Sequence, residues 1–133
     1  MLNKVFLIGN LGADPELKFT GTGTAVCDLR IATSKVVVDK DGGKKEYTEW
    51  HKVIVWGKKG ESCKEYLSKG KRVHVEGRLQ TRSWEDRDGN KRYTTEIVAE
   101  QVIFLSFKDN NESSRDNGYN APAPDEDYDP IPF

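Results

Sequence analysis

The chain has 133 residues, of which 35% are hydrophobic and 32% charged, and its formal net charge is −1 at pH 7. For 133 residues we expect one domain and at most a tail. The charge is divided unevenly: residues 1–107 hold 19 Lys and Arg against 15 Asp and Glu, whereas residues 108–133 hold 2 against 7. A basic body joined to an acidic end is typical of a nucleic-acid-binding domain with a separate interaction tail.

Three strands are predicted in the first half of the chain. An apolar run at residues 5–8 predicts the first strand, and residues 25–38 predict a long second strand with one apolar face. Turn-forming residues at 14–15 and 20–24 separate these two strands. The segment Asp-Gly-Gly at 41–43 indicates a hairpin loop that leads into the third strand.

The third strand, residues 48–57, has the sequence T-E-W-H-K-V-I-V-W-G. Residues two apart in a strand share a face, so Val53 and Val55 are expected in the core. The opposite face is expected to carry Trp50, Lys52, Ile54 and Trp56. Two indoles with a cation between them provide stacking surfaces for bases beside a contact for phosphates. The alternative is that these Trp side chains are core or subunit-interface residues.

A short helix and two more strands are predicted in the second half. Helical spacing of apolar residues within 60–70 predicts the helix. Residues 72–84 predict the fourth strand, Asp-Gly-Asn at 88–90 a second hairpin loop, and residues 92–107 the last strand. Three strands, a helix and two strands are the element order of a five-stranded Greek-key barrel, the OB-fold. Other small all-β barrels fit the same pattern.

The fourth strand repeats the pattern of the third. Its core face is expected to contain Val73, Val75, Gly77 and Leu79. Its other face is expected to contain Arg72, His74, Arg78, Arg82 and Trp84. A second strand with Trp beside basic residues favours nucleic-acid binding over burial of the indoles. The candidate phosphate contacts are Lys4, Lys52, Lys58, Arg78 and Arg82.

The chain shows no pattern typical of catalysis, a metal site or a cofactor. His51 and His74 lie in strands without a neighbouring nucleophile or a metal-spaced partner, so an enzyme is not expected. Cys27 and Cys63 are not spaced as metal ligands and are expected to be buried, reduced side chains. No signal peptide and no membrane span is recognised. A soluble protein of the reducing cytoplasm is therefore expected.

Residues 108–133 differ in character from the rest of the chain. They lack an apolar period and hold four of the five prolines, so a disordered tail is expected after a domain at residues 1–107. A solubilising tail is the simplest interpretation. The last residues favour a partner-binding tip instead, because acidic residues precede an aliphatic residue, a proline and an aromatic ring. These residues are Asp125, Glu126, Asp127, Asp129, Ile131, Pro132 and Phe133.

Short motifs in a fixed order run along nearly the whole chain. They include N-K-V-F-L-I-G-N-L-G at 3–12, A-T-S at 32–34, T-E-W-H-K at 48–52 and W-G-K at 56–58. They continue with E-Y-L-S-K-G at 65–70, V-E-G-R-L at 75–79, T-R-S-W at 81–84, R-Y-T-T-E at 92–96 and a final I-P-F. Each motif is weak alone, but their order and spacing are specific. With these motifs the sequence resembles the bacterial single-stranded DNA-binding protein family, of the homotetrameric kind.

This resemblance implies an OB-fold, a homotetramer, localisation with the nucleoid and binding of single-stranded DNA without strong sequence preference. It implies base stacking on Trp50, Trp56 and Trp84, and recruitment of replication, recombination and repair enzymes through the C-terminal tip. It places a further aromatic residue shortly after A-T-S, where this chain has Val37 instead. A primosomal DNA-binding paralogue or an RNA-binding barrel of the same fold is the alternative, which the Trp positions and the I-P-F end oppose.

Overall fold

The computed structural model describes residues 1–106, and the predicted disordered tail with its partner-binding tip lies outside these residues. Strands and one short helix make up the described part, which confirms the predicted all-β class. In chain order the elements are β1 (Val5–Leu11), β2 (Glu16–Phe19), β3 (Ala25–Val38), β4 (Lys44–Trp56), α1 (Lys58–Tyr66), β5 (Arg72–Glu85) and β6 (Lys91–Phe104).

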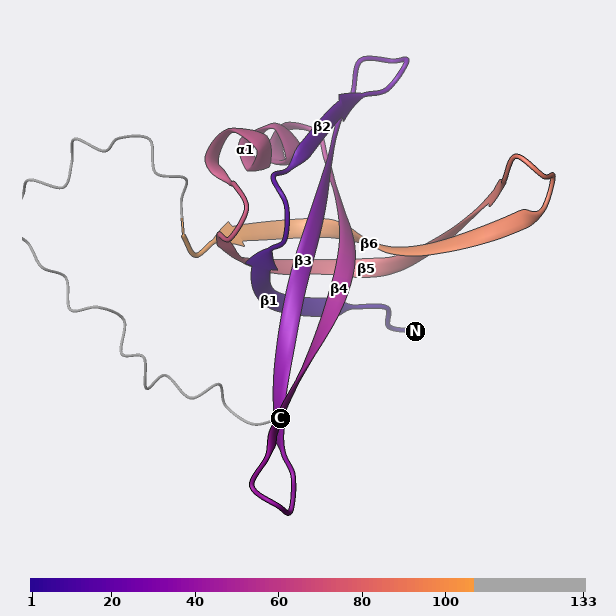
Figure 1. Cartoon of the computed structure of the whole chain (residues 1–133). Helices are drawn as coiled ribbons and strands as arrows, with labels where there is room; N and C mark the ends of the chain where they lie inside the picture. Colours follow the sequence, from indigo (N-terminus) through magenta and orange to yellow (C-terminus); the bar gives the residue numbers. More distant parts are fainter. Residues whose placement is uncertain (107–133) are drawn as a thin grey trace, which may run out of the picture.

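Five of these strands close into a barrel (Figure 1). They are hydrogen-bonded in the order β1-β5-β6-β4-β3, and a pairing of β3 with β1 closes the ring. The pairs are antiparallel except for β4 and β6, which run parallel. With α1 between β4 and β5, this is the Greek-key topology of the OB-fold that the sequence predicts.

The short strand β2 differs from the sequence expectation, which contains only turns in this region. It pairs with the first residues of β3. The loop between the two strands is closed by a hydrogen bond from the Thr20 amide to the Thr24 carbonyl (2.9 Å). Four residues between turn-forming neighbours are too few for a strand pattern in the sequence, and only the pairing with β3 makes them a strand.

The core lies inside the barrel and under α1. Its most buried side chains are Leu11, Cys27, Leu29, Ile31, Val53, Val55, Cys63, Leu67, Val73 and Val75. The inward faces predicted for the third and fourth strands are confirmed at their valines, and both cysteines are buried and free. Ile54 was expected on the exposed face but is buried, because Asp28 and Val98 stand on either side of it in the neighbouring strands.

Two hairpins extend from the barrel in different directions (Figure 1). Pairing of β3 with β4 continues to Val38 and Lys44, and pairing of β5 with β6 continues to Glu85 and Lys91. We call residues 34–48 the β3–β4 arm. In both hairpins the residues beyond the barrel are almost all exposed, so each hairpin presents side chains on both of its faces.

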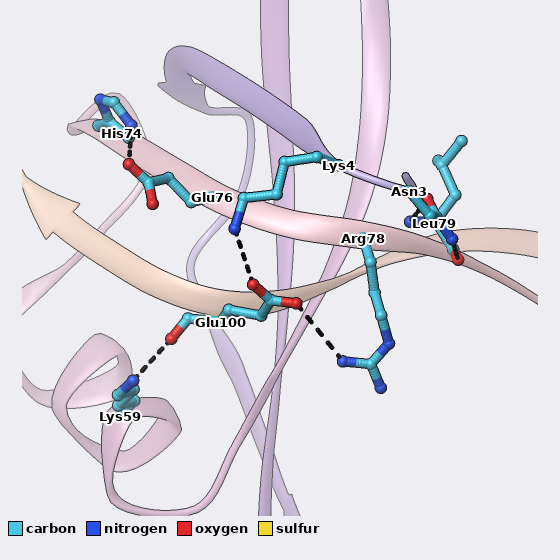
Figure 2. A network of polar contacts seen from close by, with 8 residues as sticks. All are labelled: Asn3, Lys4, Lys59, His74, Glu76, Arg78, Leu79 and Glu100. Carbon is cyan, nitrogen blue, oxygen red and sulfur yellow. Dashed lines mark hydrogen bonds and ion pairs between the residues drawn. The ribbon is translucent and has the colours of Figure 1, made fainter. Parts of the chain in front are cut away.

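Leu79 was expected in the core but is exposed. β1 pairs with β5 only as far as Gly77, so β5 has left the barrel where Leu79 lies. The side chain of Asn3 continues the ladder beyond that point: its amide nitrogen donates to the Leu79 carbonyl (2.9 Å), and its oxygen accepts from the Leu79 amide (3.0 Å) (Figure 2).

A β-bulge in β6 determines the direction of the Glu100 side chain. The β5–β6 register passes from Glu76 opposite Gln101 to Gly77 opposite Ala99, so Glu100 is the extra residue. The bulge lets Ala99 and Val102 both pack against the core although two residues lie between them in the strand. It also leaves Glu100 on the outside of the barrel, facing basic side chains of β5 and of the segment before β1 (Figure 2).

Candidate nucleic-acid interface

Trp50 lies in β4 with its indole packed against the backbone of Gly12, just after β1. A Cβ atom added to Gly12 would overlap Cζ3 of Trp50 and would lie 2.8 Å from its Cη2. The Gly12 amide is itself fixed by donating to the Arg30 carbonyl (2.8 Å). Only glycine lets the ring approach this closely, and Trp50 nevertheless remains 60% exposed. The indole is therefore supported by the barrel and still accessible to a ligand.

An open groove of about 480 Å³ borders this indole. Its walls are formed by Gly12, Ala13, Asp14, Glu16, Asp28, Arg30 and Trp50. Burial raises the pKa of Asp28, and nearby Lys52 opposes that rise. Three carboxylic side chains against one guanidinium make the groove a poor place for a phosphate, so a nucleic acid would present a base here rather than its backbone.

Trp56 is the last residue of β4 and is 48% exposed. The chain turns directly after it at Gly57, whose amide donates to the Ala25 carbonyl (2.8 Å) and whose φ is +72°. Trp50 and Trp56 share a strand face and are separated by about 20 Å at ~3.3 Å per residue. This distance leaves room for bases to stack on each indole separately.

Trp84 lies on the β5–β6 hairpin beyond the barrel and is 44% exposed. Its indole nitrogen donates to Oγ1 of Thr94 on the neighbouring strand (2.9 Å). This hydrogen bond ties the indole to the neighbouring strand β6. The structure thus places Trp50 and Trp56 on one face of β4 and Trp84 on a separate projection.

Two of the predicted phosphate contacts, Lys52 and Arg82, are joined by Glu96 of β6. The Glu96 carboxylate lies 3.1 Å from Nε of Arg82 and 3.7 Å from Nζ of Lys52, and Glu96 is only 6% exposed. Lys52 also lies 3.8 Å from the Asp28 carboxylate. These four side chains carry two positive and two negative charges, so this part of the predicted basic face is close to neutral.

Two further predicted contacts, Lys4 and Arg78, are joined by Glu100 in the same manner (Figure 2). Its two carboxylate oxygens lie 2.9 Å from Nζ of Lys4 and 3.9 Å from a terminal nitrogen of Arg78. The hydrogen bond between Lys4 and Glu100 raises the pKa of the amine and lowers the pKa of the carboxyl. A phosphate that approaches these cations has to compete with a carboxylate already in place.

Lys58 differs from the other four predicted phosphate contacts. It is exposed at the start of α1, and the described part of the chain contains no carboxylate paired with it. Val37, which stands where the resemblance places an aromatic residue, is partly buried and supplies no ring. The sequence reasoning missed Gly12, Glu96 and Glu100, each of which acts on a predicted residue far away along the chain.

The two histidines have local partners and no catalytic setting in the described residues. Nε2 of His51 is hydrogen-bonded to Oγ1 of Thr33 (2.8 Å), and Nε2 of His74 lies 3.4 Å from the Glu76 carboxylate. Residues 1–106 contain no group of three His, Cys, Asp or Glu side chains placed to hold a metal ion. That same part of the chain has no helix long and apolar enough to cross a membrane.

Comparisons with known proteins agree with this geometry. The profile of the Single-strand binding protein family matches residues 2–105. A protein named single-stranded DNA-binding protein 1 from Chlorobaculum tepidum is 46% identical over 92% of this chain and 76% of its own length. A protein of the same name from Xylella fastidiosa is 46% identical over 96% of each chain.

Two solved structures are similar to the described barrel. One is the Plasmodium falciparum SSB in complex with ssDNA, at a TM-score of 0.72 and 33% identity, covering 80% of this chain and 97% of that one. The other is a deletion mutant of the single-stranded DNA binding protein from Thermus aquaticus, at a TM-score of 0.68 and 38% identity. It covers 79% of this chain and 51% of that longer one.

Proposed function

The chain belongs to the single-strand binding protein family, and we propose that it binds and protects single-stranded DNA by stacking bases on Trp50, Trp56 and Trp84. The observation that carries this proposal is the exposure of all three indoles, at 60%, 48% and 44%. Large aromatic rings are costly to leave in water, and a base covers them. Proteins of this family are binding proteins and not enzymes, so the function needs no catalytic group.

Stacking explains why the binding has no strong sequence preference. Every base has a π-face, and each base–aromatic stack contributes ~1–3 kcal/mol. Duplex DNA hides these faces and is expected to bind far more weakly. The proposed phosphate contacts are Lys4, Lys52, Lys58, Arg78 and Arg82, of which Lys58 is the readiest because it has no carboxylate to displace within the described residues.

The test is a titration of the intrinsic Trp fluorescence with oligo-dT at several salt concentrations. Saturable quenching supports the proposal, and the affinity is expected to fall with salt at a log–log slope of about −0.7 for each phosphate contact. The same titration with an RNA homopolymer separates this function from an RNA-binding barrel. The proposal fails if oligo-dT leaves the emission unchanged at low salt.

A homotetramer is part of the proposal. β1 turns the apolar side chains of Phe6 and Ile8 outward, and both are more than half exposed in the single chain. Exposed apolar side chains that share one strand face are typical of a contact with another protein surface. Light scattering is expected to give a mass four times the 15.1 kDa of one chain, and Phe6→Glu is expected to lower it. A mass of one chain for the unsubstituted protein would exclude the tetramer.

Recruitment of replication, recombination and repair enzymes is proposed for the C-terminal tip, within the bacterial cytoplasm and with nucleoid DNA. The support is the sequence alone: Asp125, Glu126, Asp127 and Asp129 precede Ile131, Pro132 and Phe133. An apolar pocket with a basic rim is suited to such a segment. Deleting residues 131–133 is expected to abolish capture of these enzymes without weakening DNA binding. Unchanged capture would place the partner site elsewhere.

A further inference from the structure

The cations on the β3–β4 arm differ from those on the barrel. On the barrel, Glu96 and Glu100 each join two basic side chains. On the arm, Lys35 and Lys45 are exposed, and no ion pair is formed by either among residues 1–106. Their charges need not be released from a carboxylate before they meet a phosphate. Like Lys58, these two lysines of the arm are therefore cations that a polyanion can meet without displacing a paired carboxylate.

Both lysines share a face with an exposed aromatic residue, Tyr47. In the antiparallel register of β3 and β4, Lys35 lies directly opposite Tyr47 and Val37 directly opposite Lys45. Directly opposed residues lie on one face, and so do residues two apart on one strand. Tyr47 is 54% exposed. One face of the arm thus holds a ring, two cations and a small apolar side chain.

Two other exposed rings of the described residues, those of Phe6 and Tyr93, have a cation over them, whereas the Tyr47 ring does not. The ammonium of Lys4 lies 5.8 Å from the centre of the Phe6 ring, and that of Lys91 lies 5.5 Å from the centre of the Tyr93 ring. Within residues 1–106, no cation and no second ring lies over Tyr47. Its face is therefore open to a flat ligand.

We propose that Tyr47 is a further base-stacking site, and that Lys35 and Lys45 contact the phosphates on either side of the stacked base. The proposal rests on the proposed binding of single-stranded DNA and extends the DNA path along the β3–β4 arm. Glu49 stands on the same face just beyond Tyr47 and repels phosphate. The DNA backbone is therefore expected on the side of the ring toward the tip of the arm.

The first test compares Tyr47→Leu with Tyr47→Phe, because leucine keeps an apolar side chain of similar reach and phenylalanine keeps the ring. Affinity is measured by Trp fluorescence titration with oligo-dT on the full chain. Tyr47→Leu is expected to bind about fivefold or more weakly, since a base–aromatic stack is lost, whereas Tyr47→Phe should stay within about twofold of the original. Equal affinity of all three proteins, or equal loss in both variants, overturns the stacking role.

The second test uses two adjacent lysines that point to opposite faces of the arm. Lys45 shares the face of Tyr47, whereas Lys44 pairs with Val38 on the other face. Lys45→Gln is expected to make the salt slope shallower by about 0.7, the loss of one phosphate contact, and Lys44→Gln to leave it unchanged. Equal slopes in the two variants would mean that the arm acts only through its overall charge, which overturns the site.

A third measurement does not depend on any variant remaining folded. The unsubstituted protein is irradiated with an oligonucleotide that contains bromodeoxyuridine, and the crosslinked peptides are mapped by mass spectrometry. An adduct at Tyr47 is expected beside adducts at the three Trp residues. Adducts at Trp50 without one at Tyr47 overturn this inference and leave the proposed function standing. Absence of any adduct and of any fluorescence quenching means that the proposed function itself has failed.

Discussion

Replacing Gly12 with alanine is expected to weaken DNA binding through Trp50, although Gly12 itself need not touch DNA. The added Cβ atom would overlap Cζ3 of Trp50 and lie 2.8 Å from its Cη2, so the indole has to leave its position. Gly12 does not have a positive φ, and alanine therefore adds no backbone strain there. The perturbation acts on the ring alone.

The magnitude follows from the exposure of Trp50 and from the energy of a stack. Overpacking a core costs about 1–3 kcal/mol, and the low end is expected here because a ring that is 60% exposed has room to swing outward. Losing one base–aromatic stack costs ~1–3 kcal/mol, or about a five- to 150-fold loss of affinity. Gly12→Ala should therefore cost more free energy of binding to oligo-dT than free energy of unfolding.

A double-mutant cycle measures whether the effect passes through Trp50. Gly12→Ala, Trp50→Ala and the combined variant are titrated with oligo-dT, and Gly12→Ala is expected to cause almost no further loss once the indole is absent. Gly21→Ala is the matched control, because a Cβ atom there meets nothing within 4 Å. The reasoning is refuted if Gly12→Ala costs as much without the indole as with it, or if it costs nothing at all.

Three further predictions concern charge, packing and pH. Glu96→Gln is expected to strengthen DNA binding and to steepen its salt dependence, because Lys52 and Arg82 lose a competing carboxylate. Weaker binding with an unchanged slope of log affinity against log salt concentration would contradict this. Gly60→Ala is expected to lower the free energy of unfolding by about 1–3 kcal/mol, because its Cβ atom would overlap the Val55 carbonyl oxygen. Gly43→Ala is the control and should leave the stability unchanged, because the nearest atom to its Cβ would be 3.6 Å away. Burial raises the pKa of Cys27 to about 11 and of Cys63 to about 12 from the ordinary 9.0. Stability should be fully retained below pH 9 and fall as the pH rises toward these values, since the unfolded thiols ionise first; a Cys27→Ala, Cys63→Ala protein should show a flatter pH profile in denaturant titrations.

Most predictions of strands, turns and the helix from neighbours along the chain were confirmed within the described residues. Alternation in the third and fourth strands placed the valines inside, and the helical spacing within 60–70 agrees with α1. The turn residues at 41–43 and 88–90 lie at the two hairpin loops. The errors occur where an element depends on distant partners. β2 exists only because β3 pairs with it, and Leu79 is exposed because β1 ends its pairing at Gly77.

The charge of the candidate interface also depends on partners that are distant along the chain. Counting Lys and Arg along the chain predicts a basic face, but Glu96 and Glu100 are brought to that face by the pairing of β6 with its neighbours. Glu100 reaches Lys4 and Arg78 because a bulge gives β6 one extra residue at that point. A count of charges contains no information on which carboxylate faces which cation.

The sequence by itself predicted a small all-β barrel, its core valines and three Trp candidates for base stacking, because side-chain alternation and turn chemistry act over a few neighbouring residues. The tertiary structure alone decided which of those residues are supported, paired or free. Gly12 supports Trp50, Glu96 pairs with two cations, and Tyr47 lies opposite Lys35 on the β3–β4 arm. Each of these pairs joins different segments of the chain that strand pairing brings together, so strand register rather than local pattern sets it.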